Sequence, residues 1–203
     1  MRTLTEQKRN AILAAASSIF LEQGYERTSM SEVAKRAGGS KATLYNYYPS
    51  KESLFEAVIR AYSTNFLTGA AEELISAEAE THNLEEKLQR FGSRMLGVLM
   101  TDWQAMQLYR LVIGEAGHSN TGELFYESGV RQSMDALSRL MKHHIDNGDL
   151  GQSSPALRAK QFTALLKAEA DELMLRRERP AFSETQISSM VESAVRLFLA
   201  GAR

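Results

Sequence analysis

The chain has 203 residues, of which 43% are hydrophobic and 24% charged, a composition typical of a folded globular protein. With only 3 prolines, and with its glycines spread along the chain, the sequence excludes collagen-like and low-complexity structures. The absence of cysteine excludes disulfide scaffolds, thiolate metal sites and cysteine nucleophiles. The formal net charge is -1, but residues 1–60 carry +3 and the rest of the chain -4, which indicates an anionic partner for the N-terminal part.

The first 21 residues place basic side chains before an apolar stretch, as a signal peptide does, but they favour an amphipathic helix. Glu6 lies among the basic residues, Ser17 and Ser18 interrupt the apolar run, and no small-x-small cleavage site follows. The apolar residues recur at helical spacing, and Gly24 ends the segment. No other stretch approaches the ~18 apolar residues that a membrane span needs.

Helical periodicity runs along most of the chain, and the alternation typical of strands is nearly absent. Together with short loops this predicts an all-α fold. A long helix from Lys51 to about Ala79 is expected to join an N-terminal group of short helices to the remainder. The breakers in the sequence predict helices over residues 11–24, 30–37, 41–48, 51–79, 84–100, 103–115, 123–146, 155–177 and 182–200.

The most informative stretch is 28–55, which predicts a helix-turn-helix. Ser29-Met30-Ser31-Glu32 has the pattern of a capping box and predicts a helix that begins at Met30. Gly38-Gly39 predicts a tight turn, and Ser40 is suited to cap a second short helix. The N-terminal part of that second helix carries short, hydrogen-bonding side chains, as expected of a helix that enters a major groove.

This stretch closely resembles the DNA-binding domain of the TetR family of bacterial transcriptional regulators. The resemblance extends from about Arg9 to Phe55, and two positions depart from the family pattern. Gly39 stands where the family usually has valine or another aliphatic residue, so we expect a looser turn, and Pro49 follows the aromatic pair. The residues that carry the resemblance are Gly24-Tyr25, Thr28, Val33-Ala34, Ala37-Gly38, Ser40, Leu44-Tyr45, Tyr47-Tyr48, Ser50-Lys51 and Leu54-Phe55.

The resemblance implies a DNA-binding domain over residues 1–55 and a ligand-binding and dimerisation domain over residues 56–203. It implies a cytoplasmic homodimer without enzyme activity or cofactor, a repressor that a small, largely apolar ligand releases from a palindromic operator. Ser40 begins the recognition helix, and base-edge contacts would fall on Lys41, Ala42 and Asn46. Phosphate contacts would fall on Thr28, Thr43, Tyr45, Tyr47 and Lys51. The alternative for Tyr45 is packing between helices, and for Asn46 a solvated surface position.

The stretch 108–115, followed by Leu124-Phe125-Tyr126 and Gly129, resembles the C-terminal domain of AcrR- and AefR-type repressors. In this family the body binds a small molecule between its central helices. The candidate lining residues are Met95, Leu99, Trp103, Met106, Tyr109, Phe162 and Leu166, and the alternative for each is ordinary core packing. Glu169 lies on or beside the same apolar stripe, where it would face an arginine, a cationic ligand or, at a solvated edge, water.

A continuous apolar stripe with alternating spacings of three and four residues marks the last predicted helix. Together with the preceding helix it is expected to form a four-helix bundle between two chains, and the alternative is that both stripes are buried within one chain. The predicted interface residues are Ile187, Met190, Val191, Ala194, Leu197 and Phe198.

Glu115 and His118 form a Glu-x-x-His pattern, the strongest sign of an enzyme in this sequence. Helical di-iron proteins use this motif twice, together with two further glutamates. The other histidines have no glutamate three residues before them, so a helical-bundle metalloenzyme remains the weaker alternative.

Overall fold

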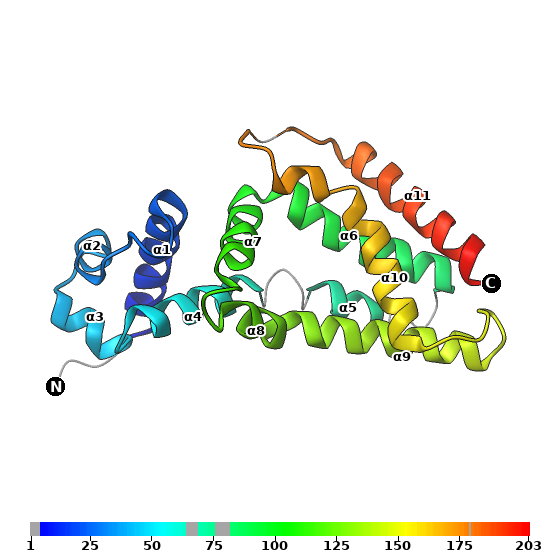
Figure 1. Cartoon of the computed structure of the whole chain (residues 1–203), viewed down its shortest axis with the longest axis horizontal. Coiled ribbons are helices and arrows are strands. Elements are labelled where there is room, and N and C mark those ends of the chain that lie inside the picture. Colours follow the sequence, from blue (N-terminus) through cyan, green and yellow to red (C-terminus); the bar gives the residue numbers. More distant parts are fainter. Residues whose placement is uncertain (1–4, 64–68, 76–81, 179) are drawn as a thin grey trace. The chain divides into compact units, whose positions relative to one another are not determined.

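The computed structural model describes residues 5–63, 69–75, 82–178 and 180–203 (Figure 1). These residues form helices and connecting turns without any strand, which confirms the predicted all-α class. The chain divides into two compact units, each with its own internal contacts. The first comprises residues 1–62 and 107–125, and the second comprises residues 63–106 and 126–203.

The first unit is built around α1 and three further helices that follow it directly in sequence. Its core includes the buried side chains of Ile12, Phe20 and Leu44, together with Leu108 and Val112 from a later part of the chain. The helices are α1 (Glu6–Gln23), α2 (Met30–Arg36), α3 (Lys41–Tyr47), α4 (Lys51–Ser63), most of α7 (Trp103–Glu115) and α8 (Thr121–Phe125).

The boundary of this unit differs from the predicted one. The sequence predicted that the first domain ends at residue 55, but the first unit continues to residue 62 and takes in residues 107–125. The physical reason is a shared core, since Leu108 and Val112 are only 2% and 3% exposed and lie in one cluster with Ile12. Local periodicity shows that a helix has an apolar face, but it does not show which distant helix covers that face.

The second unit packs α6, α10 and α11 together, with α9 beside α10 and α5. Phe162 lies in its centre, with its ring centroid 6.1 Å from that of Phe91 and 5.3 Å from that of Phe198. The elements are α5 (Gly69–Ile75), α6 (Leu84–Thr101), the π-helix η3 (Tyr126–Val130), α9 (Arg131–Asp146), α10 (Pro155–Ala168), the 3₁₀ helix η4 (Asp171–Met174) and α11 (Glu184–Ala202).

Two predicted helices are interrupted in the structure. The predicted helix over 155–177 ends at Ala168 and is followed by the short η4, and Ala170 and Leu173 of this segment are buried. The predicted helix over 123–146 contains the π-helical turn η3 between α8 and α9. The predicted long helix over 51–79 is represented by α4 and α5, while residues 64–68 and 76–81 lie outside the described residues, so its continuity stays a prediction.

We expect the contact between α6 and α11 to be intolerant of added volume at Gly92. A Cβ at this position would lie 2.8 Å from Val191 Cγ1 and 2.9 Å from Leu166 Cδ2, and both of these side chains are buried. Gly92→Ala should therefore lower the free energy of unfolding by about 1–3 kcal/mol, measured by urea denaturation of the full chain.

Gly97→Ala is the matched control, because Gly97 lies in the same helix with nothing within 4 Å of the added Cβ. This change should raise the free energy of unfolding by about 0.5–1 kcal/mol, since alanine is the better helix former. Equal stabilities of the two variants would contradict close packing at Gly92.

Candidate nucleic-acid interface

The helices α2 and α3 form the predicted helix-turn-helix, and α1 holds the first of them in place. Ser29 Oγ accepts a hydrogen bond of 3.3 Å from the Glu32 backbone N–H, so α2 begins at Met30 as predicted. The Glu32 carboxylate accepts a bond of 2.6 Å from Gln23 Nε2 of α1, rather than completing the predicted capping box. The capping residue therefore sets where α2 begins, while Glu32 joins α2 to α1.

The turn between α2 and α3 is a hydrogen-bonded helix terminus. Gly38 has a φ of +64°, a left-handed conformation that favours glycine. Its N–H donates to Lys35 O at 3.1 Å, and the Gly39 N–H donates to Ala34 O at 2.9 Å. This pair of bonds is the Schellman motif, which confirms the predicted tight turn.

The short helix α3 is buried on one side only. Ser40 Oγ caps it by accepting a bond of 3.1 Å from the Thr43 N–H, as predicted. Leu44 is 1% exposed and anchors α3 in the core of the first unit. The three residues predicted to contact base edges are all exposed, so they remain available for a partner: Lys41, Ala42 and Asn46.

The residues predicted to contact phosphate fall into two groups. Tyr45 is 41% exposed, while Thr43 and Tyr47 are half-buried at the surface. Thr28, in contrast, is 3% exposed, and its hydroxyl donates to Gly24 O at 2.8 Å. Lys51 Nζ donates to two carbonyl oxygens after α1, Tyr25 O at 3.0 Å and Glu26 O at 3.2 Å. Sequence reasoning missed these internal roles, because each depends on the path of the loop after α1.

Two carboxylates of the first unit are held by neighbouring donors. The Arg36 guanidinium contacts Glu22 at 2.5 Å, and this contact together with the Ser18 hydroxyl lowers the pKa of Glu22. At the start of α4, the pKa of Glu52 is lowered by its own backbone N–H and by the hydroxyls of Ser50 and Tyr25. Both carboxylates are therefore ionised at neutral pH and tie neighbouring segments together.

The residues predicted to line a ligand pocket lie mostly in the core. Tyr109 belongs to the first unit, where its ring centroid is 5.5 Å from that of Phe125, and Trp103 is half-buried. Glu169 is exposed just after α10 and so occupies the solvated edge that was its alternative interpretation. The ligand-binding role of the whole set stays a prediction. Five members are buried: Met95, Leu99, Met106, Phe162 and Leu166.

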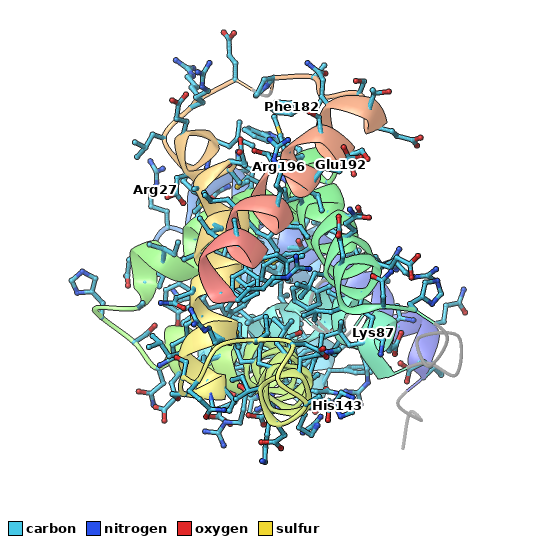
Figure 2. The ribbon with its side chains drawn as sticks, turned by 90° about the vertical axis from the view of Figure 1, so that its right-hand side faces the viewer. Arg27, Lys87, His143, Phe182, Glu192 and Arg196 are labelled. Atoms are coloured by element: carbon cyan, nitrogen blue, oxygen red, sulfur yellow. The ribbon has the colours of Figure 1, made fainter. Side chains whose placement is uncertain are left out.

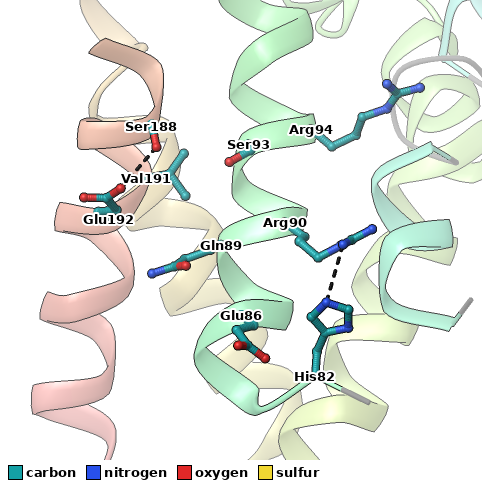
Figure 3. A pocket seen from close by; sticks show the side chains of 9 residues that line it. All are labelled: His82, Glu86, Gln89, Arg90, Ser93, Arg94, Ser188, Val191 and Glu192. Atoms are coloured by element: carbon teal, nitrogen blue, oxygen red, sulfur yellow. Dashed lines mark hydrogen bonds between the residues drawn. The ribbon is translucent and has the colours of Figure 1, made fainter. Parts of the chain in front are cut away.

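A polar groove of about 640 Å³ lies between α6 and α11 in the second unit (Figure 3). Its charged side chains do not converge on one point, because Arg90 and Arg94 point away from α11. Glu192 accepts a bond of 3.1 Å from Ser188, and Glu86 accepts one of 2.9 Å from the Asn83 N–H. This groove is polar, unlike the apolar pocket that the sequence predicted.

The stripe predicted as a dimer interface is largely internal. Four of its six residues are buried within the chain, where α11 packs against α6 and α10: Ile187, Val191, Ala194 and Phe198. Leu197 is 62% exposed and Met190 is half-buried, so only these two remain available to a second chain. Glu192 and Arg196 lie on the exposed surface of α11 (Figure 2).

A hollow of about 430 Å³ between α10 and α11 lies next to the exposed leucine. Its lining consists of Arg158, Gln161, Ala164, Leu165, Leu197, Phe198 and Gly201. The apolar surface available to a partner is therefore made by both helices. The 3–4 spacing could not separate the exposed Leu197 from the buried residues of the stripe, because all of them lie on α11.

The residues of the alternative metal site are not arranged on one helix. Glu115 is the last residue of α7, and His118 lies in the exposed turn that follows. Within the part of the chain that the structure describes, no three His, Asp or Glu side chains are grouped closely enough to hold a metal ion. No helix among the same residues combines the length and apolarity that a membrane crossing requires.

Comparison with known proteins gives two family matches, which together cover most of the chain. Residues 12–58 match the bacterial regulatory proteins of the tetR family. Residues 86–201 match the C-terminal domain of AefR-like transcriptional repressors.

The similar proteins and solved structures are also transcriptional regulators. A tetR-family regulator from Mesorhizobium loti is 27% identical over 98% of each chain, with a TM-score of 0.82. The flavonoid-responsive regulator FrrA is 30% identical over 98% of each chain, with a TM-score of 0.76. The transcriptional activator FasR of Mycolicibacterium smegmatis is 33% identical over 86 residues, which are 42% of this chain and 39% of FasR. The match to this curated relative is therefore partial, whereas the structural matches extend over nearly the whole chain.

Proposed function

Because the chain belongs to the TetR family of DNA-binding transcriptional regulators and carries an AefR-like C-terminal domain, we propose that it is a ligand-released repressor. It binds a palindromic operator as a homodimer and acts as a regulator rather than an enzyme. The observation that carries this proposal is α3, whose Leu44 is buried while Lys41, Ala42 and Asn46 are exposed. Repression is favoured over activation because residues 86–201 match the C-terminal domain of a family described as AefR-like transcriptional repressors.

In this proposal α3 enters the major groove with its N-terminal residues at the base edges. The Lys41 ammonium donates to guanine O6 and N7, and the Asn46 amide pairs with adenine. The hydroxyls of Thr43, Tyr45 and Tyr47 donate to phosphate oxygens and set the register of the protein on the duplex.

The two remaining phosphate candidates differ in what they can still donate. The single hydroxyl proton of Thr28 already goes to Gly24 O, so Thr28 supports the interface from inside the unit. The Lys51 ammonium uses two of its three N–H groups on Tyr25 O and Glu26 O. Its third N–H is left for a phosphate near the N-terminus of α4, where the helix dipole favours an anion.

We expect substitutions in α3 to separate base contacts from phosphate contacts. The probe is a duplex that the unaltered protein selects from a randomised library, compared with a scrambled duplex of the same composition. Asn46→Ala should lose about 1–3 kcal/mol of discrimination between the two, because a bidentate base contact is removed. Tyr45→Phe should weaken binding to both by a similar factor, because its hydroxyl contacts only phosphate.

Fluorescence anisotropy at several salt concentrations measures these affinities. A library selection that yields no preferred sequence would contradict sequence-specific binding. If Asn46→Ala lowered the affinity for both duplexes by the same factor, base contact by this residue would be contradicted.

The proposed dimer uses the exposed apolar surface of α10 and α11. Leu197 is 62% exposed beside a hollow lined in part by Leu165, Ala164 and Gly201. A two-fold axis would place the same surface on both chains, and it would present two α3 helices to the two half-sites of a palindrome.

Leu197→Glu should convert the dimer to a monomer, because it would place a carboxylate in the desolvated centre of the interface. Light scattering coupled to size-exclusion chromatography measures the mass. Ser188→Glu adds the same charge at an exposed position on the opposite side of α11, about two and a half turns before Leu197, and should leave the dimer intact. An unaltered protein that is monomeric at micromolar concentration would rule out this part of the proposal.

The proposed effector is a small, largely apolar or aromatic molecule. FrrA responds to flavonoids and is 30% identical over nearly the whole chain, which supports an aromatic ligand here. Among the predicted lining residues, Met95 and Met106 have flexible, polarisable side chains that adapt to ligands of different shape.

We expect flavone, used as a probe, to quench the fluorescence of Trp103, the single tryptophan of the chain. Linkage requires that an effector which lowers DNA affinity bind more weakly when DNA is present, by a coupling of about 1–3 kcal/mol. The measurement is a fluorescence titration with and without the selected duplex. Quenching with the same affinity in both titrations would mean that the aromatic ligand does not release the protein.

A further inference from the structure

Lys8, in the first turn of α1, reaches the turn of the helix-turn-helix. Its Nζ donates to Ala37 O at 2.7 Å and to Gly38 O at 3.1 Å. The sequence provides no sign of this contact, because 29 residues separate Lys8 from Ala37. One lysine thereby connects the start of α1 to the segment that leads into α3.

The two carbonyls that Lys8 contacts follow those used by the Schellman motif. That motif satisfies Ala34 O and Lys35 O with the N–H groups of Gly39 and Gly38. The next carbonyls have no helical N–H ahead of them, and the C-terminal end of α2 carries partial negative charge. An ammonium group at this place makes charge-assisted bonds and also complements the helix dipole.

Gly39 provides the space that the ammonium occupies. Unlike Gly38, it does not have a positive φ, so its backbone conformation is open to any residue. A Cβ at Gly39 would lie 3.3 Å from Lys8 Nζ and 3.4 Å from Lys8 Cε, while the next atom, Ala34 O, is 4.0 Å away. The absence of a side chain at Gly39 therefore makes room for Lys8 and does not serve to relieve backbone strain.

This pairing accounts for the departure from the family pattern at residue 39. The sequence led us to expect a looser turn where an aliphatic side chain is replaced by hydrogen. In the structure the Lys8 ammonium lies close to that position and bonds the turn to α1.

The same turn of α1 also contacts the other end of α3. The Thr5 backbone N–H donates to the Tyr47 hydroxyl at 2.9 Å, and Thr5 Oγ1 caps α1 by accepting from the Lys8 N–H at 3.3 Å. The N-terminal end of α1 therefore contacts both ends of α3. Lys8 bonds the turn that precedes α3, and Thr5, the N-cap residue of α1, bonds Tyr47, the last residue of α3.

We propose that Lys8 is a positioning residue for DNA recognition, and that it works as a pair with Gly39. Its ammonium holds the turn to α1 and thereby sets the orientation of α3, without itself contacting a phosphate. The inference rests on the proposed use of α3 in base recognition and adds the device that orients this helix.

A double-mutant cycle tests the pair, with the variants Lys8→Ala, Gly39→Val and their combination. Affinity is measured by anisotropy on the library-selected duplex at several salt concentrations. Lys8→Ala should weaken binding by at least about tenfold, which is the lower end of the usual cost of losing a hydrogen bond to a charged group. Its salt slope should stay unchanged, whereas the loss of a phosphate contact would lower the slope by about one.

Gly39→Val should weaken binding by a similar factor, because the valine side chain displaces the ammonium. The combined variant should bind no more weakly than Lys8→Ala alone, since the space left by the lysine stem accepts the valine. Lys87→Ala in α6 removes the same charge from a half-buried position in the second unit, like that of Lys8 in the first, and should leave affinity unchanged. Lys8→Met keeps the alkyl stem and tests the ammonium alone should Lys8→Ala fail to fold.

Amide hydrogen exchange on the free protein provides a readout that does not need DNA. Exchange at the Gly38 amide should accelerate in Lys8→Met and in Gly39→Val, and exchange at the Gly39 amide should accelerate in Lys8→Met, because the turn loses its bond to α1. A library selection without a preferred sequence would overturn the proposed function, while unchanged exchange at these amides would overturn the role of Lys8. A lower salt slope for Lys8→Ala, unchanged affinity, or additive losses in the cycle would each overturn it as well.

Discussion

A helix of seven residues is not stable by itself in water, and this constraint governs the arrangement of the first unit around α3. The helix forms because Leu44 is buried in a core built by α1, α2, α4 and α7. Ser40 caps its first turn, and the Tyr47 hydroxyl accepts a bond from the backbone N–H of Thr5, the N-cap residue of α1. Since burial uses one face, the opposite face is free to carry polar side chains for recognition.

The second unit follows the same physical rule on a larger scale. Its helices are long enough to carry a full apolar face, and α11 buries that face against α6 and α10 around Phe162. The close approach of α6 to α10 and α11 depends on Gly92, because the side chains of Val191 and Leu166 occupy the space that a Cβ would fill. What remains exposed after this packing, above all Leu197, is the surface available for a second chain.

Capping groups connect local sequence to tertiary structure in this protein. Ser29, Ser40 and Ser50 each accept a bond from a backbone N–H three residues later, so the starts of α2, α3 and α4 can be located from sequence alone. The donors that satisfy carbonyls at the turns come from distant residues, Lys8 for one turn and Lys51 for the other. Such donors are invisible to local patterns because their targets are set by the folded chain.

The sequence by itself determined the all-α class, the starts of the short helices and the exposed residues of α3, because capping, glycine turns and apolar periodicity act over a few residues. Only the tertiary structure decided that Leu108 and Val112 share a core with α1, and that most of the α11 stripe is buried within the chain. It also decided that Thr28, Lys8 and Lys51 bond to carbonyls of their own unit. The sequence shows that an apolar stripe must be buried and that a lysine requires hydrogen-bond acceptors. Which residues fill these roles depends on contacts between segments far apart in the chain.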